Sequence, residues 1–154
     1  AREAGERPLV VKVSPGAVDL ARLSRDGIDA GLDLLSISGS PIGYLPDRSR
    51  HAAALAAGAG ELSGPLVRPL ALAAIAATAG LRGAPPIIGG GGIGSPADAL
   101  DFFAAGATLV SLGSALWADA KLPAAVSESA RRAAAARGHD TVAGLIGTAL
   151  APTR

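Results

Sequence analysis

Short apolar segments separated by longer amphipathic ones dominate the pattern of hydrophobic and polar positions along the chain. Four apolar runs have the length of buried strands, at residues 8–14, 32–38, 85–88 and 108–112. Segments with apolar side chains at helical spacing follow them, at residues 19–31, 68–79, 96–105 and 122–137. Strands that alternate with helices at this spacing predict an α/β fold with a parallel sheet and right-handed crossovers.

Two segments depart from this alternation. Residues 39–65 lack a clear strand pattern and are predicted as a long loop, with a short helix at residues 49–57 as its one candidate element. Loops of that length in compact domains tend to be functional or mobile. The last apolar segment, residues 142–150, predicts a final helix that Asp140 and Thr141 can cap and that Pro152 stops.

The third predicted strand runs into a glycine-rich turn, residues 89–94, and then into a helix that starts at Ser95 and Pro96. Glycines allow positive φ and a close approach of the backbone to an anion, and a helix start offers N–H groups and the positive end of a dipole. The fourth strand ends in Gly113 and Ser114. Two successive strand ends of this kind form the phosphate site of TIM barrels after strands 7 and 8.

Four strand–helix units are half of the eight that a (β/α)8 barrel needs, and a full barrel takes about 250 residues. We therefore interpret residues 1–154 as one domain, the C-terminal half of a TIM barrel from its fifth strand to its eighth helix, with the N-terminal half absent. The first and fourth strands would have open parallel edges. An N-terminal half-barrel chain or a further copy in a homo-oligomer is expected to cover them. An open, doubly wound sheet is the alternative.

Composition narrows the classes of ligand. The 14 basic and 13 acidic residues give a formal net charge of +1, which leaves no electrostatic footprint for nucleic acid and favours a small-molecule substrate. No apolar run approaches the roughly 20 residues of a membrane span, so we expect a cytoplasmic protein. The chain has no cysteine and only two histidines, His51 and His139, both expected at the surface. Thiolate and imidazole-cluster metal sites are therefore excluded, and no metal is predicted.

Four motifs in the chain match those of one enzyme family. They are Val11-Lys12-Val13-Ser14-Pro15, Leu62-Ser63-Gly64-Pro65, residues 86–93, and residues 105–115. Through them nearly the whole chain resembles the C-terminal half of the dihydroorotate dehydrogenases, the FMN-dependent TIM barrels of pyrimidine biosynthesis. The Gly113-Ser114 pair is nearer to the soluble class 1 enzymes, because the quinone-linked class 2 enzymes carry a tyrosine before the Ser or Thr.

The resemblance implies a flavoprotein oxidoreductase that oxidises dihydroorotate, or a related substrate, to orotate and is active only with the missing half. It also implies a set of FMN contacts. The phosphate would be bound by the backbones of Gly91, Gly92, Gly113 and Ser114. Lys12 would lie near the N1 and C2 carbonyl edge of the flavin, where a cation stabilises negative charge on the reduced ring. Ser38 and Gly64 would line the ring and the ribityl chain.

Departures from the family pattern fall where the substrate should bind. The family places Asn-Thr after its sixth strand, where this chain has Gly39-Ser40, and Glu61 replaces a glycine next to the flavin. Losing an amide that pairs with the pyrimidine ring should weaken turnover, and Gly39→Asn is expected to improve it. The family's catalytic base, a Cys or Ser, lies in the absent half, so no catalytic residue is assigned here. Two alternatives stay open: an FMN or phosphate binder with lost or altered catalysis, and a structural partner that completes the barrel of another chain.

Other patterns in the chain have less specific interpretations. Gly89, Gly91 and Gly94 satisfy the dinucleotide pattern G-x-G-x-x-G, but no strand ends in an acidic residue about 20 positions later. Ser63 is more simply a turn residue than a nucleophile, because no partner for it is apparent. Trp117 is expected to pack between helices.

Overall fold

A four-stranded parallel sheet forms the centre of the computed structural model, which describes residues 7–16 and 19–150. Its strands lie side by side in chain order, β1 (Val10–Val13), β2 (Leu34–Ile37), β7 (Ile87–Gly90) and β8 (Leu109–Ser111). All three pairings are parallel. A doubly wound sheet reverses its strand order at a switch point, whereas a barrel does not. The observed order is that of a partial barrel.

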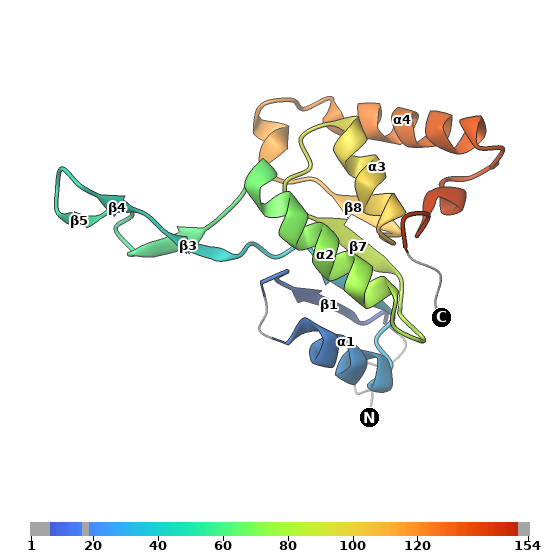
Figure 1. The fold of residues 1–154 in the computed structure, drawn as a ribbon, viewed down its shortest axis with the longest axis horizontal. Coiled ribbons are helices and arrows are strands. Elements are labelled where there is room, and N and C mark those ends of the chain that lie inside the picture. Colours follow the sequence, from blue (N-terminus) through green and yellow to red (C-terminus); the bar gives the residue numbers. More distant parts are fainter. Residues whose placement is uncertain (1–6, 17–18, 151–154) are drawn as a thin grey trace.

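Four helices connect and follow these strands, α1 (Leu20–Asp29), α2 (Arg68–Ala79), α3 (Pro96–Ala104) and α4 (Leu122–Ala136) (Figure 1). Local side chains fix where two of them begin. The Asp19 carboxylate accepts the Arg22 N–H at 3.0 Å at the start of α1, and the Ser95 hydroxyl accepts the Asp98 N–H at 3.2 Å at the start of α3. The predicted alternation of strands and helices is therefore confirmed.

The helices cover one face of the sheet and leave the other face open. Leu35, Ile37 and Ile87 on that covered face form one core with Ile75 of α2 and Phe102 of α3, and each of the five is at most 1% exposed. Side chains alternate along a strand, so the neighbours of such core residues point to the opposite face. There Val10 is 50% exposed and Leu109 is 54% exposed. A sheet with one bare, partly apolar face is what half a barrel presents.

An antiparallel arm projects from the body between β2 and α2 (Figure 1). It pairs β3 (Ile42–Tyr44) with β6 (Ala59–Glu61) and β4 (Pro46–Asp47) with β5 (Ala52–Ala53). The expectation of a loop with a short helix at residues 49–57 is therefore wrong. Gly43 lies opposite Gly60, and a Cβ on either would collide with a leucine side chain, Leu62 or Leu55 respectively. The leucine side chains therefore pack against the glycine backbone of the arm.

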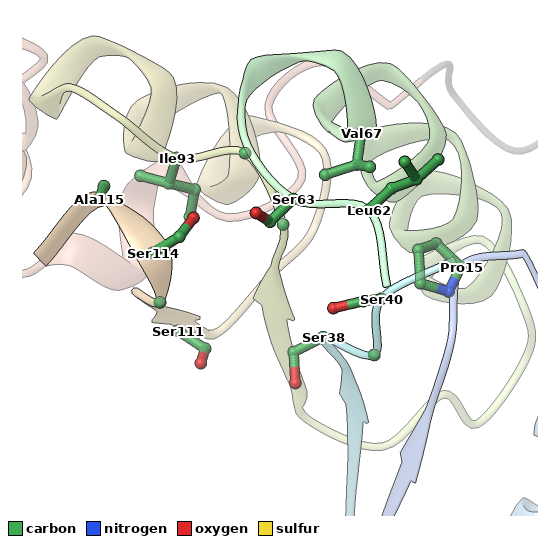
Figure 2. A pocket seen from close by; sticks show the side chains of 14 residues that line it. Pro15, Ser38, Ser40, Leu62, Ser63, Val67, Ile93, Ser111, Ser114 and Ala115 are labelled. Carbon is green, nitrogen blue, oxygen red and sulfur yellow. The ribbon is translucent and has the colours of Figure 1, made fainter. Parts of the chain in front are cut away.

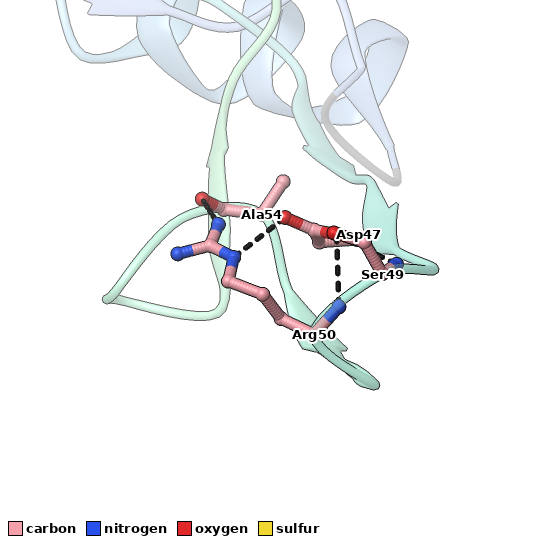
Figure 3. A network of polar contacts seen from close by, with 4 residues as sticks. All are labelled: Asp47, Ser49, Arg50 and Ala54. Atoms are coloured by element: carbon pink, nitrogen blue, oxygen red, sulfur yellow. Dashed lines mark hydrogen bonds and ion pairs between the residues drawn. The ribbon is translucent and has the colours of Figure 1, made fainter.

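The tip of the arm is closed by the carboxylate of Asp47 (Figure 3). It accepts hydrogen bonds from the Ser49 hydroxyl at 2.6 Å, the Ser49 N–H at 2.9 Å and the Arg50 Nε at 2.6 Å. The Arg50 guanidinium also donates to the Ala54 carbonyl oxygen at 3.4 Å. Led by the Ser49 hydroxyl and then Arg50, these donors lower the pKa of Asp47 from 3.8 to about 2. Asp47 thus organises a turn that the sequence did not indicate.

The C-terminal segment is less helical than expected. Only a short 3-10 helix, η3 (Val142–Leu145), forms within the predicted helix at residues 142–150. Thr141 precedes it without a side-chain capping hydrogen bond, Ile146 takes an extended conformation, and Gly147 has a φ of +72°. Glycine at such a φ ends regular helix, so the prediction of a full helix is wrong.

Candidate functional site

A cavity lies at the carboxyl ends of all four strands of the sheet, the edge where barrel enzymes place their sites. Pro15 comes from the turn after β1, and Leu62, Ser63 and Val67 come from the segment that joins the arm to α2. The remaining lining residues end or follow β2, β7 and β8 and are Ser38, Gly39, Ser40, Gly91, Gly92, Ile93, Ser111, Gly113, Ser114 and Ala115. Segments that are far apart in the sequence therefore meet at one point (Figure 2).

The glycine-rich turn supplies backbone donors to this cavity. Gly91 and Gly92 have φ values of +116° and +78°, which L-residues rarely adopt, so the sequence needs glycine there. Within the described part of the chain, the N–H groups of Gly92 and Ile93 have no hydrogen-bond acceptor. Unpaired donors at a cavity wall are suited to an anion.

The start of α3 contributes less than its sequence suggests. Ser95 already accepts the Asp98 N–H, and the Asp98 carboxylate accepts the Gly94 N–H at 3.0 Å. The N–H groups of Gly94 and Asp98 are therefore already hydrogen-bonded and are not available to a phosphate. The available donors lie instead in the turn itself and at the start of η2 (Ser114–Trp117), across the cavity.

Serine hydroxyls surround the remainder of the cavity (Figure 2). The Ser38 hydroxyl is held by a 2.8 Å hydrogen bond to the Ser36 hydroxyl beneath it. Four more hydroxyls have no hydrogen-bond partner among the residues that the structure describes; they belong to Ser40, Ser63, Ser111 and Ser114. Each can donate and accept, so the wall is suited to a ligand that carries several oxygens.

The size of the cavity matches one end of a cofactor. Its volume is about 100 Å³, and a Cβ placed on Gly113 would meet no atom within 4 Å. That space accepts a phosphate group but is smaller than the pockets that enclose a whole drug-sized ligand. The residues present therefore fit the phosphate end of FMN.

Two expected site residues lie outside the cavity wall. Lys12 is exposed and pairs in register with Ser36 on the open face of the sheet. Gly64, with a φ of +86°, forms the turn before η1 (Pro65–Val67), and its carbonyl oxygen packs against Gly92. The cavity thus brings together Ser38, Gly39, Ser40, Gly91, Gly92, Gly113 and Ser114 of the predicted set.

Three features of this region were not predicted from the sequence. Ser63 and Ser111 line the cavity, although Ser63 had been interpreted as a turn residue. The Arg68 guanidinium forms an ion pair with Asp98, and this long-range pairing has no signature in the sequence. Trp117 is 95% exposed, so the expectation that it packs between helices is wrong. Its position within η2, and not within a longer helix, explains the difference.

Comparisons with known proteins place the chain in a family. The family model described as dihydroorotate dehydrogenase matches residues 1–132. A dihydroorotate dehydrogenase B (NAD(+)) catalytic subunit from Geotalea daltonii is 36% identical over 146 residues, which is 95% of this chain and 48% of the relative. A putative dihydroorotate dehydrogenase A (fumarate) from Solibacter usitatus is 34% identical over 149 residues, again 48% of its length.

The fold agrees with a solved structure as well. The crystal structure of a ligand-free dihydroorotate dehydrogenase from Eimeria tenella superposes with a TM-score of 0.73 at 23% identity, covering 91% of this chain and 39% of that one. The chain therefore spans about half the length of the curated relatives it matches. No helix in the described residues is long and apolar enough to cross a bilayer. By sequence and by fold, the chain belongs to the dihydroorotate dehydrogenase family.

Proposed function

We propose that this chain provides the phosphate-binding half of an FMN-dependent oxidoreductase that oxidises dihydroorotate, or a closely related substrate, to orotate in pyrimidine biosynthesis. The observation that carries the proposal is the cavity at the strand ends. There Gly92 and Ile93, whose N–H groups have no acceptor in the described part of the chain, line a cavity of about 100 Å³ together with the start of η2. The names of the relatives support the reaction class.

Different residues of the chain would bind different parts of the cofactor. The backbones of Gly91, Gly92, Gly113 and Ser114 would bind the phosphate. Ser38, fixed by Ser36, would contact the ribityl chain, and Lys12 on the open face would place a cation near the ring. FMN, when bound, would accept the hydride removed from the substrate. The glycines let the phosphate approach closely, and the neighbouring serine hydroxyls orient it.

Under this proposal, oxidation of the substrate requires a second half of the barrel. The open face of the sheet exposes about half of Val10 and of Leu109, and the relatives are about twice as long as this chain. A chain that supplies the first four strand–helix units, or a second copy of this one, would cover that face and enclose the flavin ring. Burying such apolar area is favourable, and closing the barrel removes both open edges.

One observation favours a second candidate function, a half-barrel that binds FMN but whose chemistry is altered. Gly39 stands where the family presents an asparagine, and a Cβ there would lie 2.8 Å from the Ser14 Cα. The substrate side of the cavity therefore has neither the amide nor room for it. On this alternative, the chain binds the cofactor and serves as the structural partner of another chain.

One experiment separates the two functions. The protein is purified from its native cells with any chain that accompanies it, loaded with FMN and mixed anaerobically with dihydroorotate. Bleaching of the flavin absorbance supports the oxidoreductase. Retained FMN without bleaching supports the binding half-barrel, and failure to retain FMN contradicts both.

A further inference from the structure

We propose that Arg68 is a positioning residue for the phosphate-binding loop, residues 91–95, and that it acts through Asp98 and through the start of α2. The inference rests on the proposed function, because it takes this loop to hold the phosphate of FMN. Arg68 is not among the residues that line the cavity. Its contacts instead fix the loop from two sides.

The first side is the packing of Gly92 on α2. A Cβ on Gly92 would lie 2.7 Å from the Gly64 carbonyl oxygen and 2.9 Å from both the N and the Cβ of Arg68. The loop therefore rests directly on the first residue of α2, with no space between them. Any shift at the start of α2 is transmitted to Gly92, because close-packed backbone cannot absorb it.

The second side is the carboxylate of Asp98. Its Oδ2 accepts the Gly94 N–H at 3.0 Å, and its Oδ1 forms an ion pair with the Arg68 Nη1. The Asp98 side chain is 16% exposed and that of Arg68 is 34% exposed. The helix pairs Arg22–Asp26 and Arg132–Glu128 have side chains that are 61% to 76% exposed. Water screens the Arg68–Asp98 pair less, so removing it should have a larger effect.

The charge of Asp98 gives the pairing a second consequence. A carboxylate next to an anion-binding loop repels the phosphate, and the neighbouring guanidinium offsets that charge. Removing Arg68 would both release the loop and leave the carboxylate uncompensated. An asparagine at position 98 keeps an acceptor oxygen for the Gly94 N–H but has no charge. Asp98→Asn should therefore recover part of the affinity lost in an Arg68→Ala background.

The test compares FMN with riboflavin, which lacks the phosphate, by titration calorimetry on the protein in its native assembly. Arg68→Ala should weaken FMN about tenfold, or about 1.4 kcal/mol, and leave riboflavin unchanged. Arg68→Lys and the double variant Arg68→Ala/Asp98→Asn should regain part of the loss. Arg132→Ala, which breaks an exposed ion pair, should change neither affinity.

Equal losses for FMN and riboflavin would show a general structural role and overturn the inference, and so would an unchanged preference for FMN in Arg68→Ala. If Arg68→Ala does not fold, Arg68→Gln keeps more of the aliphatic stem, removes the charge and is read by the same criteria. A wild-type protein that binds both flavins equally contradicts the proposed phosphate site itself. If instead the wild type prefers FMN and the Arg68 variants keep that preference, only the inference about Arg68 is overturned.

Discussion

Gly39 packs directly against the backbone of Ser14. A Cβ on Gly39 would lie 2.8 Å from the Ser14 Cα and 2.9 Å from both the Ser14 N and the Val13 carbonyl oxygen. The Gly39 N–H also donates to that Val13 oxygen at 3.0 Å. The turn after β1 and the segment after β2 are thus in backbone contact at the rim of the cavity. The predicted gain in turnover from Gly39→Asn therefore requires the turn after β1 to move.

Substituting Gly39 should lower stability because the backbone of the neighbouring turn must move. Gly39→Ala is expected to reduce the free energy of unfolding by about 1 to 3 kcal/mol, the usual effect of overpacking. Gly80→Ala is the matched control, since Gly80 has helical dihedral angles and a Cβ there would meet only ordinary contacts of 3.5 Å and longer. It should be neutral or slightly stabilising. Urea denaturation measures both, and equal effects would contradict the close contact.

A negative charge in the cavity should oppose phosphate binding. Ser114→Asp places a carboxylate at the start of η2, across from the glycine-rich turn, and should weaken FMN by about tenfold or more while leaving riboflavin unchanged. Ser114→Asn has nearly the same size without the charge and should retain most of the affinity. Fluorescence titration of the flavins measures this. Equal FMN affinities in the two variants would place the phosphate elsewhere.

The fold could be predicted from the sequence where the physics is local. Apolar runs such as residues 32–38 and the helical spacing of residues 68–79 determine single elements, and their alternation determines a parallel sheet. The arm could not be predicted, because its strands are two or three residues long and contain alanine, glycine and proline. Its turn depends on the Asp47 carboxylate, whose four donors, two from Ser49 and two from Arg50, come together only in the folded chain.

In the candidate site, too, the features that depend on local sequence could be predicted and those that depend on distant contacts could not. Glycine at positions 91 and 92 reflects a local backbone requirement, the positive φ, and was therefore visible in the sequence. The Arg68–Asp98 ion pair and the contact of Gly39 with Ser14 join segments that are distant along the chain. No periodicity or motif encodes them. The exposure of Trp117 likewise depends on how the short η2 lies on the body.

The tip of the arm should respond to acid through Asp47. Its pKa is lowered to about 2 by the donors of Ser49 and Arg50, so the folded turn prefers the ionised carboxylate. The interaction is fully present above the ordinary pKa of 3.8 and is lost as the pH falls through about 2. The amide NMR shifts of Ser49 and Arg50 should titrate in that window and should not do so in Asp47→Asn. A midpoint near 4 would contradict the network.

Two aromatic side chains should differ sharply in their contribution to stability. Phe102 is fully buried, and Phe102→Ala should lower the free energy of unfolding by about 3 to 5 kcal/mol. Trp117 is 95% exposed, and Trp117→Ala should change it by less than about 0.5 kcal/mol. Urea denaturation followed by circular dichroism suits both variants. A large loss in Trp117→Ala would show that this indole is covered in solution.

The most direct test of the central claim is the affinity of the wild-type protein, in its native assembly, for FMN compared with riboflavin. The two ligands differ only in the phosphate that the glycine-rich turn and the start of η2 are proposed to bind. We predict that FMN binds at least about tenfold more tightly, and that inorganic phosphate competes with FMN but not with riboflavin. Equal affinities for the two flavins, or no binding of either, would contradict a phosphate site at the carboxyl ends of β7 and β8.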